Sequence, residues 1–353
     1  MRIAVTGSIA TDHLMTFPGR FTDHLIEDRL HTVSLSFLVD ELEVRRGGVG
    51  PNICFGLARL GLTPLLVGAA GQDFDGYRAW LEENGVHTGH VLVSDRHQTA
   101  RFVCTTDADN NQIASFYAGA MAEARHVDLG RVRELAGGLD LVLIGANDPD
   151  AMLRHAADCR ALGIPFAADP SQQLARIPGE RIRTLIDGAE YLFGNEYERE
   201  LLCKHAAWTP EEIAARVRVW VTTLAADGVR VQSADGVDLT VPAVPVSAIA
   251  DPTGCGDALR AGFLAARSRG LSLERAAQLG CAMAALALET VGTQTYAAHP
   301  REILERLTAA YGAPVAAEFE PWLTPEDRPA ADTRPQDAAA LAQPLAHLGG
   351  ARP

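Results

Sequence analysis

Lysine is almost absent from this chain. Its 353 residues include a single lysine, Lys204, and the residue that follows it is His205. A Walker A phosphate loop ends in Gly-Lys-Ser/Thr because the lysine reaches the terminal phosphates of the nucleotide. No such loop can therefore form anywhere in the chain. If the protein handles a nucleotide, backbone N–H groups and other side chains must bind its phosphates.

Paired cysteines, excess positive charge and long apolar runs are missing as well. The six cysteines include no Cys-x-x-Cys pair, which is typical of reduced intracellular thiols and gives no spacing for structural zinc. The formal net charge of −14 argues against a nucleic-acid partner. The apolar run near 276–288 is shorter than the roughly 18 residues of a membrane span, and the N-terminus lacks the layout of a signal peptide. These absences predict a cytoplasmic protein that binds neither nucleic acid nor membrane.

A dinucleotide-binding fingerprint is also lacking. Gly254-x-Gly256 is followed by Leu259 where a third glycine is required, and Asp-Pro-Thr precedes it instead of a buried strand. This mismatch disfavours a dinucleotide oxidoreductase.

What the chain does have is the segment Asp251-Pro-Thr-Gly-Cys-Gly-Asp257, which leads directly into an apolar helical pattern. Glycines 254 and 256 allow a tight turn whose N–H groups face an anion, and the start of a helix adds partial positive charge. Asp257 follows in the first helical turn. An anion hole beside a carboxylate is what an enzyme that phosphorylates a hydroxyl group needs. A capping aspartate at an ordinary helix start is the structural alternative.

The remaining pattern predicts a mostly parallel sheet with helices between its strands. From residue 139 onward, short apolar runs alternate with helical stretches, which is typical of βαβ units. Polar residues that directly follow strands line the ligand site in such folds. These are Asp12 after the first strand, which could bind a vicinal diol or lie in a surface loop, and Gln172, Gln173, Asn195, Glu198, Thr222 and Thr223.

Two segments interrupt this alternation. Residues 31–45 and 99–117 have the alternating pattern of strands, and we interpret them as a small separate sheet that serves as a lid or a dimer surface. Phe102 and Phe116 could stack on an aromatic base or face a small core. Between the two segments, Gly47 and Gly48 allow a ligand to approach the backbone, and Asn52 points toward it from the next helix. Past Gly312, a composition rich in alanine and proline predicts disorder.

The Gly47-Gly48…Asn52 element and the 251–257 segment resemble the two signatures of the ribokinase (PfkB) carbohydrate-kinase family. The resemblance covers about residues 1–312 and implies a three-layer α/β/α ribokinase-like core with a mostly parallel sheet and a small β lid. The segments 6–14, 33–38 and 169–176 are similar to those of actinobacterial adenosine kinases. Cys255 replaces the alanine that is commoner in the family, and Ala225 replaces a frequent glycine.

The resemblance implies a role for each candidate residue. Asp257 is the general base, and the N–H groups of Gly254, Cys255 and Gly256 form the anion hole. The nucleoside set is Ser8, Asp12, Ser36, Gly48, Asn52, Phe102, Phe116, Gln172 and Gln173. The ATP set is Asn195, Glu198, Thr223, Gly228 and Arg176, in which Glu198 contacts Mg²⁺ through water.

The sequence thus predicts an ATP-dependent nucleoside kinase, with adenosine as the expected acceptor and AMP and ADP as products. ATP and Mg²⁺ are the expected cofactors, with K⁺ as a further monovalent cation, and the lid is expected to join two copies in a homodimer. Two alternatives stay open. One is a kinase for another nucleoside or a free sugar, and the other is a nucleoside-binding protein without catalysis. Asp257 together with Asn195 and Glu198 argues against the second, because a binder has no use for a base beside an anion hole.

Overall fold

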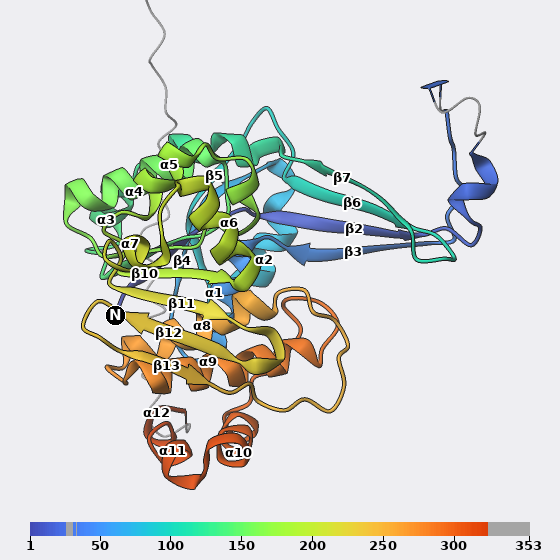
Figure 1. The fold of residues 1–353 in the computed structure, drawn as a ribbon. Helices are drawn as coiled ribbons and strands as arrows, with labels where there is room; N and C mark the ends of the chain where they lie inside the picture. The colour runs from blue at the N-terminus through green and yellow to red at the C-terminus, as the bar shows by residue number, and fades with distance from the viewer. Residues whose placement is uncertain (26–30, 33, 324–353) are drawn as a thin grey trace, which may run out of the picture.

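The computed structural model describes residues 1–25, 31–32 and 34–323, and a large twisted sheet forms its centre (Figure 1). Within these residues, nine strands pair in the order β13-β12-β11-β10-β9-β8-β1-β4-β5, and the pairs from β11 to β5 are all parallel. The strands are β1 (Ile3–Thr6), β4 (Leu65–Ala70), β5 (His87–Val93), β8 (Leu141–Ile144), β9 (Phe166–Ala168), β10 (Tyr191–Asn195), β11 (Val219–Thr223), β12 (Val229–Ser233) and β13 (Asp238–Val241). The predicted mostly parallel sheet is confirmed.

Helices cover both faces of this sheet and give the predicted three layers. One face carries α1 (Val49–Arg59), α2 (Asp75–Glu83), α8 (Cys255–Ser268), α9 (Leu273–Leu288), α10 (Pro300–Tyr311), α11 (Ala313–Ala317) and α12 (Glu320–Leu323). The other carries α3 (Leu129–Leu135), α4 (Pro149–Leu162), α5 (Gly179–Ile186), α6 (Glu196–Ala206) and α7 (Pro210–Ala214).

Side-chain alternation along the strands supplies both cores. In β8, Leu141 and Leu143 pack toward α1 and α8, whereas Val142 and Ile144 pack toward α3 and α4. Both sets are buried because a parallel sheet between two helical layers has no solvent-facing side. The strand ends nearest the lid then lie along one edge, which is where the polar residues of the sequence analysis are found.

The lid is a second sheet that projects from the body as an arm (Figure 1). Four further strands of the described chain form it in the order β3-β2-β6-β7, namely β2 (Ala10–Thr16), β3 (Glu41–Gly47), β6 (Ala100–Thr106) and β7 (Gln112–Tyr117). The predicted hairpin within 99–117 is β6–β7. Sequence reasoning missed β2, because the polar residues after β1 resemble a loop, whereas they pair with both β3 and β6.

The first predicted lid strand is shifted along the chain. Residues 34–40 contain no strand, and the strand within 31–45 begins at Glu41. The alternation near Phe37 has another cause, since its ring packs 4.8 Å from Phe17 and 4.9 Å from Phe21 between ring centroids. Val33, which belongs to the same pattern, lies outside the described residues.

The C-terminal boundary also differs from the predicted one. Helices continue beyond Gly312 to Leu323, where the predicted disordered tail should already have begun. They persist because Phe319 is fully buried and Leu323 is 3% exposed, both in the core beside α9 and α10. Residues 324–353 of the predicted tail lie outside the described residues. Among the helices that are described, none has the length and apolar character needed to cross a bilayer.

Candidate active site

The Gly-rich turn sits at the start of α8, as predicted. Gly254 precedes the helix with a φ of 77°, and a Cβ there would lie 2.8 Å from Cγ2 of Thr293, so only glycine fits. The first regular hydrogen bond of the helix runs from the N–H of Ala258 to the Gly254 carbonyl. The N–H groups of Gly256 and Asp257 come before it, in the turn where helical N–H groups lack intrahelical partners. This is an anion-binding geometry.

The thiol of Cys255 does not take part in that geometry. It donates to the Ala284 carbonyl of α9 at 3.4 Å, and burial raises the pKa of the thiol. The sequence difference at this position therefore leaves the backbone N–H groups unchanged and adds a protonated side chain directed at the neighbouring helix.

Asp257 has the environment expected of a general base. Burial raises the pKa of its carboxyl to about 7, while the charge of Arg260 and a hydrogen bond from Asn52 act in the opposite direction. Nδ2 of Asn52 donates to Oδ2 of Asp257 at 2.8 Å. A base is most effective when its pKa lies near the working pH, because it is then both ionised and able to accept a proton.

A buried ion pair stands beside this carboxylate. The Arg260 guanidinium binds both oxygens of Asp169, with Nη2–Oδ1 at 2.8 Å and Nε–Oδ2 at 2.5 Å, and the two side chains are 8% and 2% exposed. Arg260 therefore neutralises Asp169, whose charge would otherwise raise the pKa of Asp257 further. Neither residue was predicted to belong to the site. The signal for Arg260 was available, since positions i and i+3 share one face of a helix.

Asn52 is held by more partners than its predicted contact with substrate requires. Its Oδ1 lies 2.9 Å from Oγ1 of Thr293 and 2.9 Å from Nε2 of Gln294. Nε2 of Gln294 also donates to the hydroxyl of Tyr77, which in turn donates to the Gly47 carbonyl at 2.9 Å. No local sequence pattern identifies these partners of Asn52, because they lie far from it along the chain. They are Tyr77, Thr293 and Gln294.

Ser8 and Gly48 shape the start of α1. Oγ of Ser8 accepts from the Val49 N–H at 3.2 Å, and its carbonyl accepts from the Gly50 N–H at 3.2 Å. Gly48 has a φ of 95°, and a Cβ there would lie 2.4 Å from the Ser8 carbonyl oxygen. These two residues bring α1 against the end of β1 and so place Asn52 beside Asp257.

Three predicted nucleoside contacts share one face of the lid. Asp12 in β2 is level with Phe102 in β6, and Phe102 is level with Phe116 in β7, so their side chains project to the same side. Asp12 lies over Gly47, because a Cβ there would be 2.8 Å from its Oδ2. Burial raises the pKa of Asp12, and the charge of Arg45 partly offsets this. The carboxylate and the two rings thus form a row across one face of the lid.

The Asn-x-x-Glu element caps a helix. Oδ1 of Asn195 accepts from the Glu198 N–H at 2.8 Å, and Oε2 of Glu198 accepts from the Asn195 N–H at 2.8 Å, a reciprocal pair at the start of α6. Oε1 of Glu198 accepts from the Ser171 hydroxyl at 3.1 Å and raises the pKa of Asp169 through space. The element therefore lies near the Arg260–Asp169 pair with its orientation fixed.

The edge of the sheet beyond β10 holds the other predicted ATP contacts. Thr223 ends β11 beside Asn195, and Gly228 turns the chain toward β12 with a φ of 99°. Ala225 between them has a φ of 51°, in the left-handed region that favours glycine. The frequent glycine that this alanine replaces would fit that backbone without strain.

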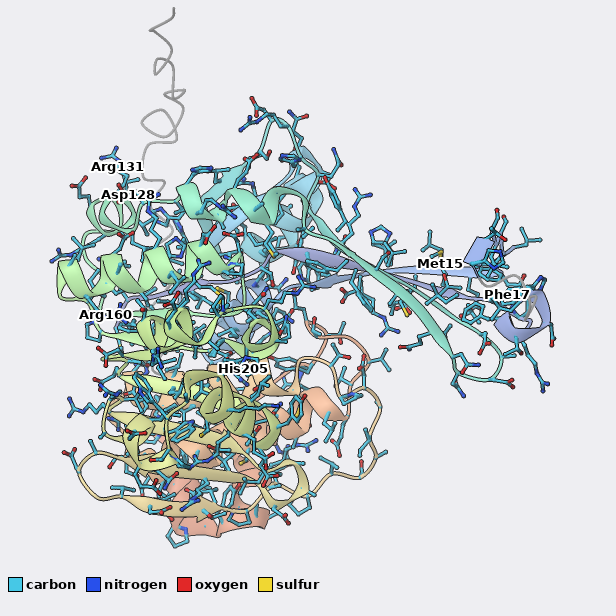
Figure 2. The ribbon with its side chains drawn as sticks, turned by 45° about the horizontal axis from the view of Figure 1, so that its top comes forward. Met15, Phe17, Asp128, Arg131, Arg160 and His205 are labelled. Atoms are coloured by element: carbon cyan, nitrogen blue, oxygen red, sulfur yellow. The ribbon has the colours of Figure 1, made fainter. Side chains whose placement is uncertain are left out.

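The structure does not bring every predicted residue to the site. Gln172 and Arg176 are exposed at the 3-10 helix Ser171–Ala175, whereas Gln173 is buried and its Oε1 has no partner among the described residues. Ser36 is exposed and adjoins Phe37, which packs on Phe17. Figure 2 shows Phe17 at the outer end of the lid arm, remote from the body, so Ser36 does not lie beside Asp12 in this structure.

The side chains present suit a metal that arrives with phosphate ligands. Among the residues that the structure describes, no group of three or more His, Cys, Asp or Glu side chains could hold an ion on its own. Mg²⁺ commonly keeps several waters and is held by one or two carboxylates together with substrate phosphates. The carboxylate of Glu198 fits that limited part.

Comparison with known proteins places these features in context. The model of the pfkB family carbohydrate kinases matches residues 8–299. A nucleoside kinase of Methanothermobacter thermautotrophicus is 31% identical over 296 residues, covering 82% of this chain and 94% of that protein. The nucleoside kinase of Methanocaldococcus jannaschii is 28% identical over 264 residues, covering 74% and 85%.

Solved structures agree with these sequence matches. The nucleoside kinase of Burkholderia thailandensis in complex with inosine superposes with a TM-score of 0.78 at 33% identity, covering 88% of this chain and 99% of that one. The same kinase in complex with ADP-inosine gives a TM-score of 0.75 at 35% identity, covering 88% and 96%. The fold is ribokinase-like, as the sequence predicted. The resemblance to actinobacterial adenosine kinases is supported only at the level of nucleoside kinases, since these relatives carry that broader name.

Proposed function

The chain belongs to the pfkB family of carbohydrate kinases, and from this we propose that it is an ATP-dependent nucleoside kinase acting on the 5′-hydroxyl of adenosine. Membership of the family makes it a phosphotransferase with an alcohol group as acceptor. One observation carries the more specific proposal. Asp257, whose carboxyl has a pKa of about 7, lies in the first turn of α8 directly after Gly256, and Asp12 shares one face of the lid with Phe102 and Phe116.

The reaction follows from that arrangement. Asp257 accepts the proton of the 5′-hydroxyl while the hydroxyl oxygen attacks the γ-phosphorus. The bond from phosphorus to the β,γ-bridging oxygen breaks, and ADP leaves with the electron pair of that bond. Of the three N–H groups predicted for the anion hole, that of Cys255 donates to the Pro252 carbonyl at 3.4 Å, and those of Gly254 and Gly256 are proposed to stabilise the charge on the transferred phosphoryl oxygens. When bound, Mg²⁺ would supply further positive charge to the phosphates, and Glu198, whose Oε1 accepts from the Ser171 hydroxyl, is the residue proposed to hold it through water.

Acceptor recognition is assigned to the lid and the adjoining strand ends. The carboxylate of Asp12 suits the two ribose hydroxyls, because an ionised carboxylate accepts hydrogen bonds through both oxygens. Phe102 and Phe116 present ring faces on which a base can stack, and stacking of a base on an aromatic side chain contributes about 1–3 kcal/mol. Gln173, buried with a free amide oxygen, is proposed to read the polar edge of the base.

Inosine is the second candidate acceptor. A similar kinase from Burkholderia thailandensis was solved with inosine, and its chain is covered almost completely by this one. The two purines differ at position 6, where adenosine carries an amino donor and inosine a carbonyl acceptor. A side-chain amide such as that of Gln173 can rotate to serve either, so stacking and ribose contacts alone do not separate these acceptors.

A panel of acceptors tests the proposal. Adenosine, inosine, guanosine, cytidine and ribose are supplied with ATP and Mg²⁺, and ADP release is followed for the wild-type enzyme and for Asp257→Asn. A purine nucleoside is expected to have the highest kcat/KM, and Asp257→Asn is expected to lower kcat by about 10²–10⁴-fold with little change in nucleoside affinity. Ribose turned over as well as adenosine would overturn the nucleoside assignment. Nucleoside binding without any ADP release would favour the binding-protein alternative.

Replacing K⁺ by a larger organic cation in the same assay tests the predicted monovalent cation.

The predicted homodimer through the lid stays part of this proposal. Leu42, Val44, Ile113 and Tyr117 share the lid face opposite Asp12, and between 46% and 59% of each is exposed. A second copy of that face would cover them. Light scattering is expected to give twice the monomer mass for the wild type and the monomer mass for Val44→Glu. A monomeric wild-type protein at micromolar concentration contradicts the dimer.

A further inference from the structure

We propose that Tyr77, Thr293 and Gln294 are positioning residues for phosphoryl transfer, which hold the Asn52 amide with its nitrogen facing Asp257 and tie this geometry to the root of the lid. The inference rests on the proposed role of Asp257 as the base. It goes beyond that role because it assigns a task to three residues that touch neither reacting atom.

The orientation of the Asn52 amide is fixed by its partners. Oδ1 receives a hydrogen bond from Nε2 of Gln294 and faces the hydroxyl of Thr293, whereas Nδ2 faces the acceptor-only carboxylate of Asp257. If the amide turned over, its nitrogen would meet the donor of Gln294 and its oxygen would meet the carboxylate. Both contacts are then repulsive, so the amide has a single favourable orientation.

The hydrogen bonds run in one consistent direction from the lid to the base. Tyr77 donates to the carbonyl of Gly47 and accepts from Nε2 of Gln294, and the second proton of that nitrogen goes to Asn52. Asn52 completes this series of hydrogen bonds by donating to Asp257. Oε1 of Gln294 has no partner among the described residues, so both bonds of this side chain depend on its nitrogen.

Burial makes the network rigid. Asn52, Tyr77, Thr293 and Gln294 are each between 3% and 6% exposed, so water does not compete for their hydrogen bonds. Hydrogen bonds are electrostatically stronger in such a low-dielectric environment, and a member that loses its partner pays the full cost of desolvation. Loss of one link should therefore change the position of the next.

The same residues hold the backbone where the lid begins. Gly47 ends β3, and its carbonyl accepts from Tyr77, while the carbonyl of Arg46 lies 3.1 Å from the Thr293 hydroxyl. Tyr77 thus binds the Gly47 carbonyl at the root of the lid, and the single hydroxyl proton of Thr293 is shared between the Arg46 carbonyl and Oδ1 of Asn52. The position of the base and the position of the lid strand depend on one network.

Asn52 is the neutral donor among the groups that face Asp257. Arg260 approaches from the same helix, Asp169 from the end of β9, Cys255 from the first position of α8 and Tyr296 from the segment after α9. Substitution of Gln294 or Tyr77 leaves these four groups in place. It removes only the constraint on Asn52, so the carboxylate loses a donor that favours its charged form.

The test is the pH profile of kcat for Gln294→Met and Tyr77→Phe with the nucleoside that the wild type prefers. The ionised form of Asp257 is the active one, so wild-type kcat is expected to fall as the pH drops below about 7. Both variants should move this acid limb to higher pH by about one unit, which lowers kcat about fivefold at pH 7, about tenfold at pH 6 and little at pH 9. Nucleoside KM should change less than threefold.

Matched controls separate positioning from stability. Tyr311 ends α10, remote from the base, and its hydroxyl donates to the Pro242 carbonyl at 2.7 Å. Tyr311→Phe removes this hydroxyl and should leave the acid limb unchanged. Thr293→Val should shift the limb, and Thr293→Ser, which keeps the hydroxyl, should restore it. An unshifted limb in folded Gln294→Met and Tyr77→Phe overturns the proposal, as does a change confined to KM.

A second measurement keeps the inference apart from the proposed activity. The carboxyl ¹³C shift of Asp257, assigned by its loss in Asp257→Asn, reports the titration of this group without turnover. An upward shift of the midpoint in Gln294→Met supports the positioning role even if no nucleoside is phosphorylated. An unchanged midpoint in an enzyme that phosphorylates nucleosides rejects the positioning role alone.

Discussion

The surroundings of Asp257 and the lid arm are built in opposite ways. Around Asp257, charged and polar side chains are buried and held by several partners, such as Asn52 at 5% exposure and Arg260 at 6%. Along β7 every residue from Gln112 to Tyr117 is exposed, and Phe116 is exposed over 44% of its surface. A fixed geometry suits the chemical step, which tolerates little displacement of the reacting groups. An exposed sheet suits recognition, because its side chains can be covered by an acceptor.

The contrast explains why the two halves of the function differ in how well they can be inferred. Proton acceptance by Asp257 depends on groups that contact one another within the body. The identity of the acceptor depends on what covers the lid face that carries Asp12 and Phe102. Substitutions in the body should therefore change stability and proton affinity, whereas substitutions on the lid should change the choice of acceptor.

The largest effect is expected from breaking the buried ion pair. Arg260→Met leaves the charge of Asp169 without a partner at 2% side-chain exposure, which should lower the free energy of unfolding by about 3–5 kcal/mol. The acid limb of kcat should also move to higher pH, because Arg260 favours the charged form of Asp257. Urea unfolding and a pH profile measure the two effects.

The double variant Arg260→Met/Asp169→Asn is the control for that experiment. It removes both charges, so most of the lost stability should return. The shifted acid limb should return only in part, because the cation beside Asp257 is still missing although the charge of Asp169, which raises the pKa of Asp257, is also gone. A single variant as stable as the wild type would show that the pair is not enclosed as the structure indicates.

A smaller effect, of opposite sign, is expected for Asp257→Asn. Folding raises the pKa of this carboxyl from an ordinary value near 4 to about 7. Ionisation of the carboxyl therefore lowers the free energy of unfolding progressively as the pH rises through that interval. Asparagine carries no charge. The variant should therefore unfold less readily than the wild type, by an amount that is larger at pH 8 than at pH 5 by on the order of 2 kcal/mol.

Denaturant titrations at the two pH values measure this difference. The variant is expected to be almost inactive and yet more stable, which is typical of a residue kept for chemistry at a cost in stability. Equal stability differences at pH 5 and pH 8 would place the pKa of Asp257 in its ordinary range. The carboxylate would then be a surface group and no longer a matched base.

Sequence reasoning was most accurate where structure depends on neighbours along the chain. Strand β8 (Leu141–Ile144) and helix α4 (Pro149–Leu162) belong to the alternation of strands and helices predicted from residue 139 onward, because a short apolar run and a proline at the helix start are local signals. The turn before α8 was equally readable. Glycines and an aspartate at that spacing leave few other structures open to the backbone.

It was least accurate where side chains meet across the fold. Tyr77 and Gln294 are 217 residues apart, and no periodicity in the sequence links them. Asn52 was predicted as a nucleoside contact, and its hydrogen bonds to Asp257 and Gln294 left no signal in the sequence. Strand β2 was missed because its pairing partners, β3 and β6, come later in the chain and alone make Ala10–Thr16 extended.

The smallest effect on folding, and the sharpest test of the lid, is expected for Phe116→Ala with Ile113→Ala as its matched control. Both residues are exposed on β7, at 44% and 50%, but they project to opposite faces, Phe116 to that of Asp12 and Phe102 and Ile113 to the other. Neither truncation empties a core, so the free energy of unfolding should change by no more than about 0.5 kcal/mol in either variant.

If the Asp12 face receives the base, Phe116→Ala alone loses a stacking contact and should raise the KM for adenosine about tenfold, while ribose turnover and the Ile113→Ala enzyme stay unaffected. Equal changes in KM for the two variants would mean that the lid acts through its general position and not through this ring. A loss shared by adenosine and ribose would move Phe116 from the base to the sugar, and the comparison between a chemical body and a selective arm would then hold only for Asp12.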